Sequence, residues 1–280
     1  ILRTVMPDGK IRARGVAMAM QGSSISNCDV GSVTVKLSDE GTYHITVGCT
    51  DMGTGCDTII AQFAADVLET PIDNISVYGV DTDISPYDSG SYASSTTYLT
   101  GMAAVKACEQ LRERIIALAA VRMNKDASAL TFDGENVIDE SDGAKMSLFD
   151  IATASMCNNE ISLEVTYSHS SPVSPPPFMA ACAEIEADPE TGAIELLDYT
   201  ACVDCGTVVN TNLARVQTEG GLLQGIGMTL YEDIWYDERG KNLSNSFMQY
   251  KVPSRLDTDR IRVEFDSSYE PTGPFGAKSI

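Results

Sequence analysis

Residues 41–68, GTYHITVGCTDMGTGCDTIIAQFAADVL, predict a strand, a glycine-rich loop and an amphipathic helix in immediate succession. Apolar residues alternate over 42–48, as in a strand, and recur at helical spacing over 57–68. The loop between them, residues 49–55, offers backbone N–H groups at a helix N-terminus, which can hold an anion such as phosphate. Its glycine spacing matches neither a Walker A loop nor the dinucleotide fingerprint. A tight turn that needs two glycines is an equally good interpretation.

Strands and helices continue to alternate on both sides of this stretch. A strand over 32–37 precedes it, and a strand over 74–80 and a long helix over 96–123 follow it. Residues 167–177, which include three consecutive prolines, then predict a linker.

A second half is expected beyond this linker. Its predicted elements are strands over 178–187 and 194–203, a helix over 212–231 and strand character over 233–265. We therefore expect an α/β (α+β) protein of two α/β lobes. The first lobe is expected to cover residues 1–168 and the second residues 169–280.

The charge balance excludes several classes of partner. The 280 residues contain 19 Lys and Arg against 40 Asp and Glu, a formal net charge of −21. Nucleic acids and anionic membrane surfaces require clustered cations, so we expect neither as a partner. Neither a membrane-spanning apolar run nor a signal peptide is visible, which favours a cytoplasmic protein. A start without Met and an abrupt end at Ile280 predict that the sequence is a piece of a longer chain.

The cysteines and histidines indicate no metal site. Eight cysteines are too few for a disulfide scaffold of this length, so reduced thiols are expected. Cys202 and Cys205 have the spacing of a metal or redox pair, but no second pair follows and only His44 and His169 are available.

Two further segments are candidates for binding a polar ligand. Residues 89–97, SGSYASSTT, carry more hydroxyl groups than one helix cap requires, although a solvated serine-rich loop explains them equally well. The helix over 215–227 contains four glycines, each of which costs about 1 kcal/mol relative to alanine. Either a ligand or a neighbouring backbone can require such a surface, and Gln217 and Gln224 lie on one face of this helix.

No catalytic motif accompanies these candidate binding segments. The sequence contains neither a Gly-x-Ser-x-Gly elbow nor a His-Glu-x-x-His motif, and two histidines leave no plausible Ser-His-Asp set. The chain is therefore expected to hold an anionic ligand without supplying a catalyst of its own.

Motifs in a fixed order carry a resemblance over nearly the whole chain. They are residues 50–55 with Gln62 and Ala65, 81–82, 92–95 with 99–101, 184–188 with 191–192, 204–206 with Asn210, 217–221, 224–227 and 250–253. This series resembles the molybdenum hydroxylases, the xanthine dehydrogenase and aldehyde oxidase group. It is similar to the C-terminal molybdenum-cofactor-binding domain of their large subunit.

The resemblance implies roles for particular residues. Residues that would contact the pterin cofactor are Met52, Gly53, Thr54, Ala93, Ser94, Ser95 and Gln217. A substrate pocket would lie near Ser23 and Ser24, where purine-oxidising members have an aromatic wall, so a compact or polar substrate is expected. The alternative is that the other molybdenum-cofactor domain supplies the aromatic rings. No residue of the chain would bind the metal directly. The catalytic base would be a glutamate that follows Ile280.

The implied activity is the oxidative hydroxylation of an aldehyde or an N-heterocycle by a molybdenum–molybdopterin cofactor, in the mononucleotide or the cytosine dinucleotide form. Iron–sulfur and FAD groups and the other molybdenum-cofactor domain would lie on partner domains or subunits. The isolated chain is then expected to be inactive. The alternatives are a non-catalytic cofactor-binding or assembly module with the same fold and an unrelated anion-binding domain.

Overall fold

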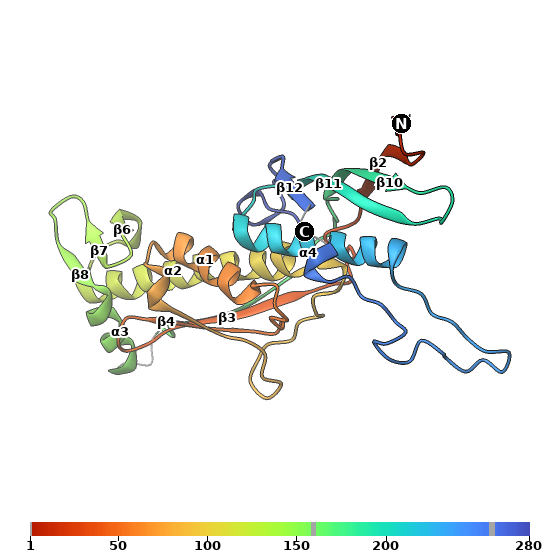
Figure 1. Cartoon of the computed structure of the whole chain (residues 1–280). Helices are drawn as coiled ribbons and strands as arrows, with labels where there is room; N and C mark the ends of the chain where they lie inside the picture. The colour runs from red at the N-terminus through yellow and green to blue at the C-terminus, as the bar shows by residue number, and fades with distance from the viewer. Residues whose placement is uncertain (1, 158–160, 258–260) are drawn as a thin grey trace. The chain divides into compact units, whose positions relative to one another are not determined.

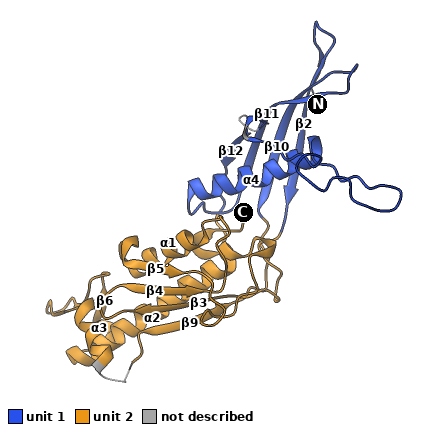
Figure 2. Ribbon diagram, turned by 60° about the horizontal axis from the view of Figure 1, so that its bottom comes forward, with its two compact units in different colours: residues 1–21, 177–268, 280 blue, residues 22–176, 269–279 orange. Residues whose placement is uncertain are grey.

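The computed structural model describes residues 2–157, 161–257 and 261–280. The chain forms two compact units (Figure 2). One contains residues 1–21, 177–268 and 280, and the other contains residues 22–176 and 269–279. The units therefore differ from the consecutive lobes 1–168 and 169–280, because the N-terminal residues pair with strands of the second half of the chain.

The first unit is built on a five-stranded sheet in the order β1-β2-β10-β11-β12 (Figure 1). Its strands are β1 (Arg3–Val5), β2 (Ile11–Met20), β10 (Phe178–Ala187), β11 (Ile194–Asp204) and β12 (Ile261–Phe265). All neighbours are antiparallel except β11 and β12, which are parallel. Helix α4 (Thr211–Leu230) places Leu222 in a small core with Ala181, Ala201 and Val263. The predicted strands over 178–187 and 194–203 and the helix over 212–231 are confirmed.

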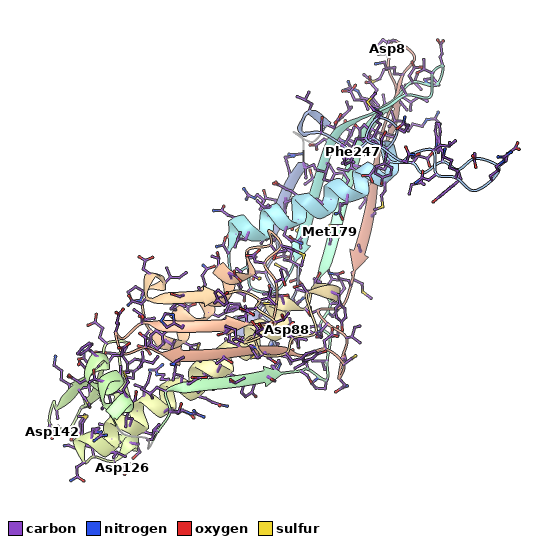
Figure 3. All side chains as sticks on the ribbon, turned by 90° about the horizontal axis from the view of Figure 1, so that it is seen from below. Asp8, Asp88, Asp126, Asp142, Met179 and Phe247 are labelled. Carbon is purple, nitrogen blue, oxygen red and sulfur yellow. The ribbon has the colours of Figure 1, made fainter. Side chains whose placement is uncertain are left out.

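The strand character expected over 233–265 is mostly absent from the described residues of that range. Only β12 and one isolated bridge between Tyr236 and Asn242 are found. Side chains of the segment satisfy local N–H groups instead: the Asp237 carboxylate accepts from Arg239 and Lys241, each at 2.9 Å. Such side-chain bonds compete with strand pairing. This segment also exposes large apolar side chains, among them Phe247 (Figure 3).

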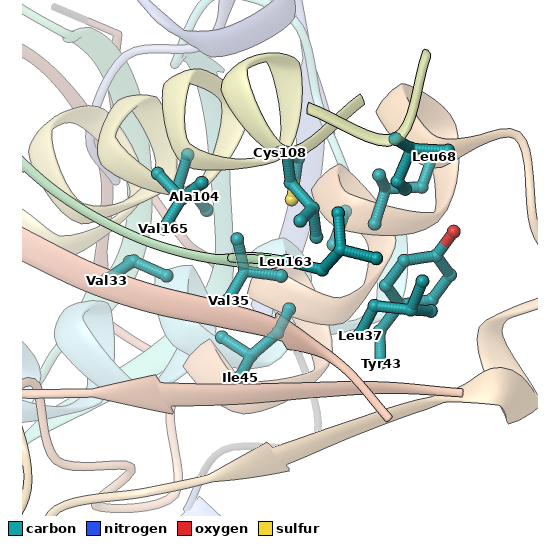
Figure 4. Close-up of a cluster of buried hydrophobic side chains, with 14 of the residues drawn as sticks. Val33, Val35, Leu37, Tyr43, Ile45, Leu68, Ala104, Cys108, Leu163 and Val165 are labelled. Carbon is teal, nitrogen blue, oxygen red and sulfur yellow. The ribbon is translucent and has the colours of Figure 1, made fainter. Parts of the chain in front are cut away.

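The second unit contains a four-stranded sheet in the order β5-β4-β3-β9. Its strands are β3 (Gly31–Leu37), β4 (Tyr43–Val47), β5 (Ile75–Tyr78) and β9 (Glu164–His169). Helices α1 (Cys56–Leu68) and α2 (Gly101–Met123) pack on this sheet (Figure 4). The core between them includes Val33, Val35, Ile45, Ala104 and Cys108. The predicted strand–loop–helix stretch and the long helix are therefore confirmed, the latter beginning as a π-helical turn over Thr96–Thr100.

A smaller layer at the end of α2 completes this unit. It consists of a three-stranded sheet, β6 (Leu130–Phe132), β7 (Asn136–Asp139) and β8 (Lys145–Ser147), followed by α3 (Leu148–Cys157). The predicted linker over 167–177 overlaps the end of β9, and its remaining residues lead without regular structure from the second unit into the first.

Candidate functional site

The loop that joins β4 to α1 is organised by the carboxylate of Asp51. One oxygen accepts the N–H groups of Gly53 at 2.9 Å and Gly55 at 3.0 Å, and the other accepts the N–H of Asp57 at 3.5 Å. Both glycines have positive φ angles, 102° and 78°, which side-chain-bearing residues rarely adopt. The tight turn with two required glycines is thus the structure found. The protein's own carboxylate occupies the N–H groups that were candidates for an external phosphate.

The ionisation of Asp51 reflects this arrangement. Burial opposes its charged form, but the backbone N–H groups, led by those of Gly55 and Gly53, outweigh burial and lower its pKa. The adjacent Asp57 has a raised pKa, because of burial first and the charge of Asp51 second. Asp51 is therefore ionised at neutral pH and fixes the loop at the start of α1.

We expect Asp51→Ala to lower the free energy of unfolding by about 0.5–2 kcal/mol at pH 6, similar to the cost of losing a side chain that bonds N–H groups at the start of a helix. Because the folded-state pKa lies below the ordinary value of 3.8, this contribution is complete above that pH. It is lost as the pH falls through the lowered pKa. Urea unfolding at pH 6 and pH 3 measures the difference, with the exposed Asp66→Ala as control. An equal loss of stability in Asp51→Ala at pH 6 and at pH 3 would contradict a stabilising role for the ionised Asp51 carboxylate.

A second loop, residues 86–95, lies beside the start of the loop that joins β4 to α1. A Cβ added to Gly48, at the end of β4, would lie 2.6 Å from the Asp88 Cβ, so the two backbones approach closely there. Asp88 (Figure 3) accepts from the Gly90 N–H at 2.8 Å and from the Thr100 hydroxyl at 2.9 Å. The Ser89 hydroxyl bonds both the N–H and the carbonyl of Val30, each at 3.0 Å. The loop is thereby fixed to the end of the sheet.

The second loop ends in an unusual turn. Ala93 and Ser94 both adopt left-handed φ angles, 51° and 53°, although neither is glycine. Such backbone costs about 1–3 kcal/mol per residue and persists only where its surroundings enforce it. Tyr92 before the turn donates its hydroxyl to Asp29, which is 1% exposed. Ser95 after it is buried and donates its hydroxyl to the Gly90 carbonyl at 2.9 Å.

The glycine-rich helix α4 has a face that the described part of the chain leaves open. A Cβ at Gly220, Gly221 or Gly225 would meet no described atom within 4 Å. Only Gly227 is crowded, with Pro253 carbon atoms 3.0 and 3.1 Å from such a Cβ. Gln217 lies on the exposed part of this helix. Close packing within the described chain, here against the side chains of Pro253 and Glu232, therefore explains Gly227 alone among the four glycines.

The expected pocket residues Ser23 and Ser24 are buried, with 0% and 6% of their surface exposed. The Ser23 hydroxyl donates to the Pro175 carbonyl at 2.5 Å and accepts from the Ser279 N–H at 3.1 Å. The Ser24 hydroxyl has no hydrogen-bond partner among the described residues. Ser23 therefore holds the C-terminal part of the second unit and does not project into an open pocket of this chain.

The chain's other candidate metal ligands are one group of acidic and thiol side chains, the CxxC pair and His169. Within the described residues, the metal-like group is Asp51, Cys56 and Asp57, whose ligand atoms lie within 4.8 Å of one another. Asp51 is engaged with the loop N–H groups, as described above. Of the CxxC pair, Cys202 is exposed and Cys205 is buried. Burial lowers the pKa of His169, which favours its neutral form.

All predicted cofactor residues except Ser95 are accessible, as contact with a large polar ligand requires. Ser95 is 3% exposed and its hydroxyl is bonded to the Gly90 carbonyl, so it supports the loop instead of facing a ligand. Met52, Gly53, Ala93 and Gln217 are exposed, and Thr54 and Ser94 are half-buried. Those of the two loops lie in the second unit, whereas Gln217 lies in the first. The residues that sequence reasoning missed are the supporting ones, Asp51, Asp88 and Asp29. An Asp two positions before a glycine, as in residues 51–53 and 88–90, is a detectable signal for the first two.

Residues 3–259 match the family model of the molybdopterin cofactor-binding domain. Since the match extends over most of the chain, the chain belongs to this family. The expected similarity to the molybdenum hydroxylases is confirmed.

Curated relatives are subunits or enzymes of the same family. The protein named probable hypoxanthine oxidase XdhD of Escherichia coli (strain K12) is 37% identical over 269 residues, 95% of this chain and 28% of that protein. The gamma subunit of the 6-hydroxypseudooxynicotine dehydrogenase complex of Paenarthrobacter nicotinovorans is 29% identical over 280 residues, 98% of this chain and 35% of that protein. The chain thus spans about a third of the length of these relatives.

Solved structures show the same fold. Quinoline 2-oxidoreductase from Pseudomonas putida 86 superposes with a TM-score of 0.87 and 26% identity, covering 97% of this chain and 37% of that one. The copper- and molybdenum-containing CO dehydrogenase gives a TM-score of 0.86 at 26% identity, with 97% and 36% covered. The expected α/β class is confirmed by these superpositions. Across the described residues, no helix is both long and apolar enough to cross a bilayer.

Proposed function

We propose that this chain holds the molybdenum–molybdopterin cofactor of a molybdenum hydroxylase that oxidises an aldehyde or an N-heterocycle. The observation that carries the proposal is the left-handed turn at Ala93 and Ser94, fixed by Asp88, Ser89 and Ser95. Backbone strain that the surroundings maintain is concentrated at ligand sites. The family match supplies the identity of the ligand.

The cofactor, when bound, supplies the redox chemistry, and the chain positions it. In this proposal residues 52–54 line the pterin, residues 93–94 contact it through backbone and hydroxyl groups, and the Gln217 amide hydrogen-bonds it. Asp51 and Ser95 do not contact the cofactor in this proposal. Their side chains form hydrogen bonds with backbone groups of the two loops and so hold the loops in place. A glutamate after Ile280 would act as the base that takes a proton during substrate oxidation.

The proposal includes further groups on other parts of the enzyme. These are the other molybdenum-cofactor domain and iron–sulfur and FAD centres, which would carry the electrons away. The names of two relatives support a multi-subunit assembly, because they are a "complex subunit gamma" and a nicotine 6-hydroxylase "large subunit". The proposal includes the mononucleotide or the cytosine dinucleotide form of the cofactor, a small-molecule substrate and a cytoplasmic location.

We expect Gln217→Ala in the full-length protein to weaken cofactor binding by about 1–3 kcal/mol, because a buried partner on the pterin is left without its hydrogen bond. That corresponds to roughly a 5- to 150-fold increase in the cofactor Kd. Molybdenum and pterin contents of the purified variant measure the effect. Gln224→Ala on the same helix is the matched control and should retain its cofactor. Loss in Gln224→Ala with full content in Gln217→Ala would contradict the placement of Gln217.

A further inference from the structure

Two cysteines lie at the ends of the glycine-rich loop between β4 and α1. Cys49 follows the last residue of β4 by two positions, and Cys56 is the first residue of α1. Both are buried, with 0% and 6% of their surface exposed, and both belong to the core of the second unit. Neither takes part in a disulfide in this structure. The loop of residues 50–55 is therefore bracketed by two reduced thiols.

The two thiols contact each other. Their side chains share a hydrogen bond, which raises the pKa of Cys49 more than its burial does. Cys56 in turn donates to a carboxylate oxygen of Asp57 over 3.7 Å, so its sulfur is left to accept from Cys49. Cys108, another core cysteine, differs in this respect, because burial is the first cause that raises its pKa to about 12.

The turn of the loop keeps these thiols together. Gly53 and Gly55 adopt left-handed φ angles, and the Asp51 carboxylate accepts both of their N–H groups. The chain thereby folds back and brings the start of α1 to the end of β4. A disulfide requires Cα atoms within about 7 Å and sulfur atoms at about 2 Å. Two thiols that already contact each other across a fixed turn reach this geometry by side-chain rotation and a small shift.

We propose that Cys49 and Cys56 are a modification site, at which a peroxide forms a reversible disulfide across the loop. Cys56 reacts first, because it is the more exposed of the two. Its sulfur, having lost its proton, attacks one oxygen of hydrogen peroxide, so that an S–O bond forms and the O–O bond breaks. The hydroxide that leaves takes up the Cys56 proton and becomes water.

The second step joins the two sulfur atoms. The Cys49 sulfur attacks that of Cys56, the S–S bond forms and the S–O bond breaks. The oxygen leaves as a second water with the Cys49 proton. The two thiols thus lose two electrons in total, and these reduce one peroxide to two waters.

The disulfide would close a ring of residues 49–56 around the loop. Met52, Gly53 and Thr54, which the proposed function places against the pterin, lie within this ring, but the inference itself does not rest on that function. A cross-link reduces the freedom of the opened chain between its ends. Amide hydrogen exchange at residues 50–56 should therefore become about 5- to 50-fold slower in the oxidised protein.

The test uses the wild-type full-length protein, which is first reduced and then treated with hydrogen peroxide or with buffer alone. Remaining thiols are alkylated under denaturing conditions, and the chain is cut with a protease that cleaves before aspartate. Cleavage before Asp39, Asp51 and Asp57 places Cys49 in peptide 39–50 and Cys56 in peptide 51–56. We expect mass spectrometry to find these two peptides joined after peroxide, and separate again after dithiothreitol.

Two variants and one other cysteine serve as controls. Cys108→Ala removes a thiol of the same core and should leave the joined peptides and the slower exchange unchanged. Cys56→Ser should abolish both, and the wild-type result does not depend on the folding of this variant. The exposed Cys202 shows that the oxidant acts, because its thiol should be lost to alkylation after the treatment.

Three outcomes would overturn the inference. The first is loss of the Cys202 thiol while Cys49 and Cys56 both remain fully alkylated. The second is a disulfide that joins either of these two to a different cysteine. The third is unchanged exchange at 50–56 in protein that carries the joined peptides, which would show that the cross-link does not restrain the loop. Each outcome leaves the proposed function standing, since the molybdenum and pterin contents test that function separately.

Discussion

Phe63→Ala is expected to lower the free energy of unfolding by about 3–5 kcal/mol, the usual cost of removing a large ring from a packed core. Phe63 lies on α1, is 1% exposed and stacks on Phe275. A Cβ at Gly101 of α2 would be only 2.6 Å from the Phe63 ring, which shows how closely the helices approach. Alanine would leave a cavity that these neighbours cannot close. Chemical denaturation measures the loss.

Phe149→Ala is the matched control for this change. Phe149 lies on α3 and is 59% exposed, so its removal should change stability by less than about 0.5 kcal/mol. Similar losses in the two variants would mean that Phe63 is not the buried core residue that the structure shows.

Gly134→Ala should cost more than about 3 kcal/mol, since two separate penalties add at this position. Gly134 has a φ of 92°, which strains any side-chain-bearing residue. In addition, its Cβ would overlap the carbonyl oxygen of Glu69, where α1 ends. The overlap with the Glu69 carbonyl oxygen can be removed only by a shift of the backbone of the three-stranded sheet away from the end of α1.

Gly143→Ala separates the two penalties. Gly143 has a similar φ of 73°, but its Cβ would meet no described atom within 4 Å. We expect a cost of about 1–2 kcal/mol from strain alone. Equal destabilisation of the two variants, measured by thermal or urea unfolding, would contradict the close approach at Glu69.

Sequence patterns correctly predicted the helices and strands in which buried apolar residues recur at regular helical or strand spacing. In α1 the residues Ile59, Ile60, Phe63, Ala64 and Leu68 are all buried, and the predicted helix over 57–68 begins only one residue later than the observed one. The alternating strand over 42–48 corresponds to β4 for the same reason. These signals lie within a single segment of sequence.

Elements stabilised by distant partners escaped prediction. Strand β2 is rich in Ala, Gly and Met, residues without strong strand preference, and it pairs with β10 more than 150 residues away. Strands β6, β7 and β8 have only three or four residues each, too short to show a period. The division into units follows from the pairing of β2 and was therefore missed as well.

The candidate site shows the same limit. Glycine-rich loops and a glycine-rich helix are visible in the sequence, and the structure leaves Met52, Ala93 and Gln217 of these segments exposed. The bond between Ser23 and Ser279 joins residues that are 256 positions apart, and no local pattern announces it. Sequence reasoning therefore identified glycine-rich segments that the structure leaves exposed, but not the contacts that hold them.

The most direct test of the central claim is the molybdenum and pterin content of the full-length protein, purified from its native host and measured by mass spectrometry. The account predicts molybdenum in an amount equal to that of the protein, together with molybdopterin released on denaturation. A correctly folded full-length protein that contains neither molybdenum nor pterin would contradict it.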